Sequence, residues 1–328
     1  MNIIKAKYEI IEQNYNNDLL VNMFKHIEKC GRTCYKSEDK ITNTSYEKFV
    51  NMLTSSDHGA MLEHGTVYLW MEYGKDRDQS DRIEKYLANP YTKCNCIYDN
   101  YFITTNYRVI VENNWLDDLK YMCKPTKHHE KRYTVKFTYH LAVARDVNRH
   151  RVQSVGEEST RYCNYSKYKF GSGLNYVEPV FLTDDEKQYL NNKNEQMSFA
   201  AMCNQIGNDT NYSSFEAIDY FIFALEACEF AYLNLIDLGW KPQQASLVLP
   251  FDTKTESVHT AFASDWCHFF NLRALGTTGA PRPSAKEVAW PLMEEFLNRG
   301  WITIDMINKD KYNQIKEKYP NIEDYIKL

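Results

Sequence analysis

Residues 149–161 read R-H-R-V-Q-S-V-G-E-E-S-T-R, and this stretch carries the most informative chemistry of the 328-residue chain. Three arginines, a histidine, two glutamates and two serines stand within it. Arginine forks match phosphate oxygens in bidentate fashion, and hydroxyl groups can complete the cage. Glu157 and Glu158 add acceptors for an imide or a ribose, which a site for phosphate alone would not need. The stretch therefore predicts a pocket for an anionic ligand, with a solvated, charge-mixed helix end as the alternative.

Elements on both sides of this stretch indicate a mixed fold. Just before it, residues 140–148 form a helical pattern that can bury Leu141, Val143, Ala144 and Val147 on one side. Runs rich in β-branched and aromatic residues predict strands at 66–73, 102–111 and 133–139. Helices are predicted at 46–56, within 75–100, at 215–238 behind a capping box at 213–216, in a short turn from Pro242, at 255–275, and from a cap at 284–287 with a kink at Pro291.

These elements predict an α+β fold in which an antiparallel sheet packs with long helices. The strands do not alternate with helices as in a dinucleotide-binding fold, and neither G-x-G-x-x-G nor G-x-x-x-x-G-K-[ST] occurs. No linker rich in glycine, serine or proline divides the chain. We therefore expect a single domain over 1–328, with insertions near 75–100 and 183–211.

Composition narrows the class of protein further. The net charge of -5 argues against a broad nucleic-acid-binding surface. The mean hydropathy is -0.60, and no apolar run approaches the roughly 20 residues of a membrane helix. The first residues also lack the apolar core of a signal peptide. Nine scattered cysteines indicate reduced thiols and a cytoplasmic location. We expect small-molecule partners and neither a nucleic acid nor a membrane.

The order of residues in the central stretch resembles one enzyme family. Arg149, His150 and Arg151, followed by seven residues and then Ser159, resemble the signature of the flavin-dependent thymidylate synthases. The resemblance continues through E-E-S-T-R-Y-C-N-Y-S-K at 157–167. Further matching segments lie before the central stretch, at 31–37, 58–64 and 103–108, and after it, at 248–250 and 266–273.

The resemblance implies the fold of that family, a homotetramer with sites between subunits, and a reductive methylation. In that reaction methylenetetrahydrofolate donates a carbon to dUMP, which becomes dTMP. NADPH reduces FAD, and the reduced flavin passes a hydride to the pyrimidine. The protein then contributes mainly by orienting its ligands and by electrostatic activation.

The same resemblance assigns roles to individual residues. Arg273 matches the arginine that polarises the uracil imide, and His58 matches a histidine associated with folate binding and carbon transfer; these two are the predicted catalytic residues. The residues predicted to bind dUMP are Asp146, Arg149, Glu157, Glu158, Ser159, Thr160, Arg161 and Arg273. The residues predicted to bind the flavin cofactor are His58, Arg149, His150, Arg151, Glu157 and His268. No metal site is predicted, because the adjacent His128 and His129 would point apart on a helix and lack further ligands at metal-binding spacing.

Several positions depart from the family pattern. Ser246 and Ser264 replace residues that contact nucleotide or flavin in many members, Arg282 stands where histidine is common, and Asp146 stands where some members have glutamine. These departures leave two alternatives open. One is a related enzyme that hydroxymethylates or otherwise alkylates a pyrimidine nucleotide. The other is a non-catalytic module that binds a nucleotide or a nucleic acid.

Overall fold

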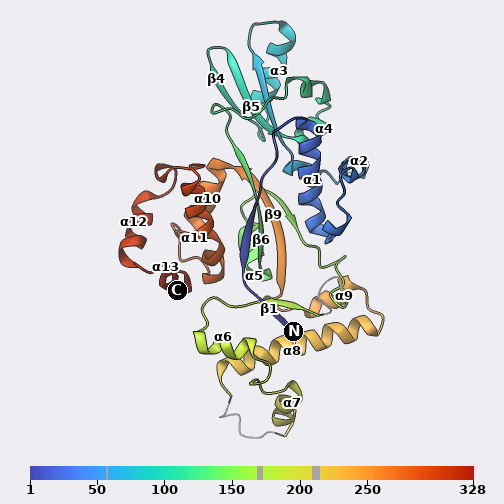
Figure 1. Cartoon of the computed structure of the whole chain (residues 1–328), viewed down its shortest axis with the longest axis vertical. Helices are drawn as coiled ribbons and strands as arrows, with labels where there is room; N and C mark the ends of the chain where they lie inside the picture. Colours follow the sequence, from blue (N-terminus) through green and yellow to red (C-terminus); the bar gives the residue numbers. More distant parts are fainter. Residues whose placement is uncertain (57, 168–172, 209–214) are drawn as a thin grey trace.

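The computed structural model describes residues 1–56, 58–167, 173–208 and 215–328. A four-stranded antiparallel sheet lies at its centre, in the order β2-β6-β9-β7. The strands are β2 (Lys7–Ile11), β6 (Arg132–His140), β9 (Lys254–Phe262) and β7 (Ser154–Glu157). Figure 1 shows the long strands β6 and β9 running through the middle of the molecule, with helical layers on either side. The predicted strand at 133–139 is confirmed within β6.

The predicted helix at 255–275 is wrong in its first half. That half is β9, and the helix α10 begins only at Ala263 and runs to Arg273. The reason lies in the polar side chains of β9, which are buried but paired. Thr260 Oγ1 lies 2.8 Å from Thr134 Oγ1, and Ser257 Oγ lies 2.9 Å from His259 Nε2. The buried side chains of β9 mix Thr, Ser and His with Val258, Ala261 and Phe262, so they show no regular alternation of apolar and polar residues that would predict a strand.

A second, three-stranded sheet in the order β3-β5-β4 forms the part at the top of Figure 1. Strand β3 (Thr66–Glu72) confirms the prediction at 66–73. The strand predicted at 102–111 is instead β5 (Asn100–Asn106), and helix α4 (Tyr107–Glu112) follows it at once. Asn106 causes this change because its side chain accepts a hydrogen bond from Val109 N at 3.1 Å and caps the helix. The region is completed by β4 (Lys93–Ile97), α1 (Leu19–Tyr35), α2 (Ser45–Ser55) and α3 (Arg77–Leu87), and α2 and α3 confirm the helices predicted there.

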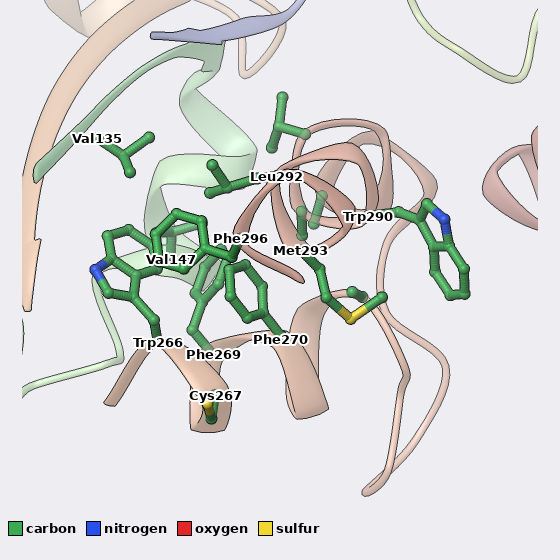
Figure 2. Close-up of a cluster of buried hydrophobic side chains, with 14 of the residues drawn as sticks. Val135, Val147, Trp266, Cys267, Phe269, Phe270, Trp290, Leu292, Met293 and Phe296 are labelled. Atoms are coloured by element: carbon green, nitrogen blue, oxygen red, sulfur yellow. The ribbon is translucent and has the colours of Figure 1, made fainter. Parts of the chain in front are cut away.

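The C-terminal helices pack on one face of the central sheet. Trp266, Phe269 and Phe270 of α10 interlock with Phe296 of α11 (Pro283–Asn298), as Figure 2 shows. The predicted cap at 284–287 is wrong, because α11 begins at Pro283 directly after Arg282 and Ser284 is already buried in its first turn. Helix α5 (Leu141–Val147), as predicted, packs its apolar side into the same core, and α12 (Lys309–Lys318) and α13 (Ile322–Lys327) close it.

A third part surrounds the long helix α8 (Ala217–Asp237), which confirms the predicted helix. Its first turn is capped by Glu216, whose N–H donates to the Asp219 carboxylate at 2.9 Å. Ser213 and Ser214 of the predicted capping box lie outside the described residues. The other elements here are the parallel pair β1 (Asn2–Ile4) and β8 (Asn175–Val177), with α6 (Asp184–Asn191), α7 (Phe199–Gly207) and the predicted α9 (Pro242–Ala245).

Short 3-10 helices occupy Glu38–Lys40, Gly59–His64, Leu116–Tyr121, Ser246–Val248 and Ile304–Met306. Across the described ranges, no helix is both long and apolar enough to span a bilayer.

Candidate active site

Arg273, at the end of α10, is held by the last turn of α5 and by the turn that follows it. Its Nε donates to His150 Nε2 at 3.1 Å, and its Nη2 donates to the carbonyl oxygen of Asp146 at 2.6 Å. Two N–H groups of one planar guanidinium therefore have fixed acceptors, which determines the orientation of the whole group. The sequence separation between Arg273 and His150 is 123 residues, so only the packing of α10 against α5 and the sheet brings them together.

His150 is a neutral hydrogen-bond acceptor in this arrangement. Its ring is buried edge-on against Phe269, with ring centroids 5.1 Å apart, and lies 5.6 Å from the ring of His268. Burial, with further contributions from Arg273 and His268, lowers the pKa of His150 to about 4. An imidazole that is neutral at pH 7 can accept a hydrogen bond from the Arg273 N–H without charge repulsion. Burial also lowers the pKa of Arg273, although the Asp146 carboxylate opposes this shift.

A cavity of about 400 Å³ opens beside this pair. Arg149, His268 and Leu272 line it together with His150 and Arg273, and residues 278–281 form its remaining wall. The loop after α10 can turn back over the cavity because Gly276 has a φ of +67°. A Cβ at this position would also meet Pro281 Cδ at 2.7 Å. The cavity thus combines two arginines with an apolar side chain and two imidazoles.

Arg282 and Asp146 form an ion pair next to the cavity. Arg282 Nε lies 3.2 Å from Asp146 Oδ2, while the Asp146 carbonyl accepts from Arg273. Asp146 therefore connects two arginines through different atoms. The two residues singled out in the sequence as departures from the resembled pattern thus lie together as one charge pair.

Glu157, at the end of β7, is held in place by neighbouring side chains. Its carboxylate accepts from Asn148 Nδ2 at 2.8 Å and from Thr255 Oγ1 at 3.2 Å. Burial raises the pKa of Glu157 despite these two hydrogen bonds. Such a carboxylate can serve as an acceptor close to the 149–153 turn, where Asn148 and β7 fix its position.

Glu158 points into a buried charge network on the central sheet. Its carboxylate accepts from Lys254 Nζ at 2.7 Å and from the Tyr165 hydroxyl at 3.2 Å. Lys36 and Lys254 also contact Glu256, at 2.5 and 3.0 Å. Although burial opposes ionisation, these lysines and Lys136 hold the pKa of Glu256 below its usual range. Glu158 is therefore placed where it stabilises the loop that follows it.

Ser159, Thr160 and Arg161 form that loop, and none of them lines the cavity of Arg273. The N–H of Ser159 donates to the Cys34 carbonyl at 3.0 Å, and its Oγ accepts from the N–H of Arg161 at 3.3 Å. The Arg161 side chain is exposed, with its guanidinium 5.7 Å from the Tyr162 ring. In one chain these predicted dUMP-binding residues therefore lie apart from the Arg273 cavity, with Ser159 and Thr160 half-buried and Arg161 exposed.

Arg151 lines a second and larger cavity of about 720 Å³ between the two antiparallel sheets. Arg108 and the buried Arg132 also line it, and Arg108 pairs with Glu63 at 2.6 Å. The arginines of the 149–151 segment therefore face two different cavities. His58 lines neither of them; it is exposed at the start of the 3-10 helix that contains Glu63.

The comparison with protein families now identifies the chain. The model of the family described as thymidylate synthase complementing protein matches residues 113–299, more than half of the chain. The chain belongs to this family. The family is that of the flavin-dependent thymidylate synthases, so the resemblance seen in the sequence is confirmed, as is the mixed fold with antiparallel sheets. The protein is a thymidylate synthase of the methyltransferase type.

Solved structures similar to this thymidylate synthase include two of the UMP/dUMP methylase PolB from Streptomyces cacaoi. The complex with 5-Br dUMP shares 17% identity over 91% of this chain and 93% of that chain, with a TM-score of 0.39. The complex with 5-Br UMP shares 16% identity over 91% and 92% of the two chains, also with a TM-score of 0.39. No curated protein matches the chain.

The structure places the predicted site residues in four places. Asp146, Arg149, His150, His268 and Arg273 meet at the first cavity, and Arg151 lines the second. Glu157, at the end of β7, and the loop of Glu158 to Arg161 lie at the charge network, and His58 lies apart. The sequence-based assignments omitted Arg132, Arg108 and Glu63 of the second cavity, although the matching segments at 58–64 and 103–108 contain two of them. Within the described part of the chain, no three His, Cys, Asp or Glu side chains cluster closely enough to bind a metal.

Proposed function

We propose that this protein catalyses the reductive methylation of dUMP to dTMP, with methylenetetrahydrofolate as the carbon donor and FAD, reduced by NADPH, as the hydride donor. One observation carries the proposal. Arg273, the residue matched to the imide-binding arginine, is fixed by His150 Nε2 and the Asp146 carbonyl beside the cavity that Arg149 lines.

The fixed guanidinium explains how the chain would activate a uracil ring. A cation held in advance beside an imide stabilises negative charge that develops on the ring, without the cost of reorganising its donors during the reaction. Arg149 supplies a second cation in the same cavity, suited to an anionic nucleotide. Because His150 is neutral, it positions Arg273 and adds no further positive charge.

The second cavity has the side chains that a flavin dinucleotide would require. Its wall holds four cationic side chains, Lys93, Arg108, Arg132 and Arg151. They outnumber its three carboxylates, those of Glu63, Glu112 and Asp265, which suits a diphosphate. Phe262 adds an aromatic surface, and the volume of about 720 Å³ lies within the range of cofactor pockets. When bound, the flavin would supply the hydride. Arg151 and Arg132 would hold its phosphates. His150 and His268 line the other cavity, beside Arg273, where the nucleotide would bind.

We also propose a homotetramer in which neighbouring subunits complete the site. Arg161 is exposed, Ser159 is half-buried, and both lie outside the Arg273 cavity, as expected if their loop serves a site formed with another subunit. Large apolar side chains near α8 and α9 are exposed as well, among them Leu238 at 81% and Leu247 at 83%. We propose further that the chain acts as one catalytic domain with the insertions noted above. The nine free thiols support a cytoplasmic location.

The test uses the purified full-length protein with FAD, dUMP, methylenetetrahydrofolate and NADPH, and mass spectrometry of the nucleotide product. Formation of dTMP, abolished by Arg273→Ala and retained by the exposed control Arg77→Ala, supports the proposal. A product heavier than dTMP by one oxygen would indicate the hydroxymethylating alternative. A flavin spectrum that dUMP does not perturb, together with unchanged dUMP, would contradict the proposed reaction.

A further inference from the structure

The loop of residues 89–93, between α3 and the start of β4, forms one wall of the second cavity (Figure 1). Its residues Asn89, Pro90, Tyr91 and Lys93 all line that cavity. The loop belongs to the segment that the sequence predicts as an insertion, and it lies outside the residues that the family model matches. It therefore adds side chains to the cavity for which the resemblance assigned no role.

Hydrogen bonds fix the conformation of this loop. Asn89 Oδ1 accepts from the N–H of Tyr91 at 2.9 Å and from the hydroxyl of Thr92 at 3.2 Å. Thr92 Oγ1 also lies 2.9 Å from Oγ1 of Thr105, which is buried on β5. Pro90 restricts the backbone between these contacts. A loop that is fixed in this way loses little conformational entropy when a ligand binds to it.

Tyr91 gives the cavity an aromatic side chain at its opening. Tyr91 lines the cavity and is nevertheless 67% exposed, so most of its surface is not used for packing within the protein. Planar bases stack on aromatic rings of this kind with little dependence on the identity of the base. The position therefore suits the base of a nucleotide.

Lys93 adds a cation that has no carboxylate at hydrogen-bond distance. Its Nζ lies 4.4 Å from the centre of the Phe262 ring and contacts Ser264 Oγ. The Glu130 carboxylate is 3.7 Å away, which is longer than a hydrogen bond. The ammonium group can therefore still bind a phosphate oxygen.

The other cations of the cavity differ in how far the protein neutralises them. Arg108 contacts the carboxylates of Glu63 and Glu112, both at 2.6 Å, so its charge is balanced within the protein. The guanidinium of Arg132 instead donates to a carbonyl and two hydroxyl oxygens, which are neutral, and lies 5.6 Å from the centre of the Phe262 ring. Positive charge is thus available to a ligand around Phe262, on the side of the 89–93 loop.

We propose that the 89–93 loop binds the adenosine monophosphate half of FAD, with Lys93 on its phosphate and Tyr91 against the adenine. This inference rests on the proposed function, because the hydride of the flavin has to reach a pyrimidine beside Arg273. The flavin ring then lies toward the turn at 149–151, which separates the two cavities, and the other half of the cofactor lies toward the loop.

The test is isothermal titration of the full-length protein, freed of flavin by dialysis, with FAD, with NADPH and with FMN, which lacks the adenosine monophosphate half. We expect Tyr91→Ala and Lys93→Ala each to raise the Kd of FAD about tenfold and to leave the Kd of FMN unchanged. Tyr91→Phe should bind FAD as the wild type does, because the ring makes the contact. Tyr98→Ala and Lys75→Ala are the matched controls, since both residues are exposed in the same region and line neither cavity. They should bind FAD normally.

The outcomes separate this inference from the proposed reaction. Unchanged FAD binding in Tyr91→Ala or Lys93→Ala would overturn the inference and leave the proposed methylation standing. Equal losses for FAD and FMN, or a loss confined to NADPH, would overturn it as well. A wild-type protein that does not bind FAD would overturn both. FAD binding that depends on Tyr91 and Lys93, in a protein that forms no dTMP, would support the inference and contradict the reaction.

Discussion

Asp146 and Arg282, 136 residues apart in the sequence, form an ion pair in which Arg282 Nε lies 3.2 Å from Asp146 Oδ2. Both residues were singled out in the sequence as departures from the resembled pattern. In the fold each one supplies the opposite charge for the other. Through its carbonyl oxygen Asp146 also holds Arg273, which connects this pair to the proposed imide-binding group.

The ion pair predicts non-additive effects on nucleotide binding. We expect Asp146→Asn and Arg282→Gln each to raise the Kd of dUMP severalfold. The Kd of the double variant should not exceed that of the single variant that binds dUMP less tightly, because both substitutions remove the same contact. The melting temperature should hardly change, since exposed ion pairs contribute only about 0–1 kcal/mol. Titration calorimetry of all four proteins provides the measurement, and fully additive losses would refute the coupling.

Arg273 should matter for turnover more than for flavin binding. Arg273→Ala is expected to retain FAD and to lose at least a hundredfold in kcat, because the fixed donor beside the imide is removed. Arg273→Lys should recover little of this loss, since an ammonium cannot bond His150 and the Asp146 carbonyl in the same planar arrangement. Flavin absorbance and dTMP formation are measured on the same samples. Retained turnover in Arg273→Ala would remove the assigned role.

Arg161 should act in nucleotide binding with little influence on stability. Its side chain is exposed, so Arg161→Ala is expected to weaken dUMP binding about tenfold or more while the melting temperature stays within one degree of the wild type. Arg77→Ala, at an equally exposed arginine on α3, is the control for a general loss of positive charge. A cooperative loss of structure in Arg161→Ala would instead indicate a structural arginine.

Glu158 should act in the opposite way, through stability. Glu158→Gln removes one of the two carboxylates that contact the buried Lys254, while Glu256 remains at 3.0 Å. A buried charge left without any partner costs about 3–5 kcal/mol, so with Glu256 in place we expect a smaller loss, about 1–3 kcal/mol in the free energy of unfolding by urea. Glu9→Gln, which breaks the exposed Lys29 pair, serves as the control and should change little. Unchanged stability in Glu158→Gln would show that the network does not hold the loop.

The buried histidines predict a loss of stability in weak acid. Burial lowers the pKa of His150 to about 4 and those of His26 and His259 to about 3. The unfolded chain, with histidine pKa values near 6.5, therefore binds more protons than the native state at pH 5. The stability that comes from burying neutral histidines is therefore complete above about pH 6.5. It is lost as the pH falls toward the native pKa values of about 3 to 4.

At pH 5 each such histidine destabilises the native state by about 2 kcal/mol relative to pH 7.5. Urea unfolding at both pH values measures the effect. In His259→Asn we expect a shallower dependence of the free energy of unfolding on pH, because about one proton fewer is taken up on unfolding. A free energy of unfolding that is the same at both pH values would contradict the neutral, buried state of these rings.

Sequence patterns predicted the elements whose buried residues are apolar. Strand β3 and helix α8 were found because β-branched and apolar residues recur at the expected spacing. Strand β9 was predicted as a helix because buried polar residues such as Ser257 and His259 interrupt its apolar pattern. Their burial is possible because they are hydrogen-bonded, and the partner Gln153 of His259 comes from a distant segment that no local pattern indicates. The candidate site shows the same limit. The motif at 149–161 identified its residues, but no pattern could indicate that Arg149 and Arg151 face different cavities.

The position of β9 between β6 and β7 has a consequence for biosynthesis. Both neighbours of β9 emerge from the ribosome about 100 residues before it, so neither can complete its ladder at that stage. The turn with Arg149 and His150 links these two strands through α5, and its partner Arg273 is translated later still. A nascent chain that stops before residue 254 therefore exposes an unpaired strand edge and holds no assembled site. Assembly of the site thus reports that synthesis has passed β9 and α10.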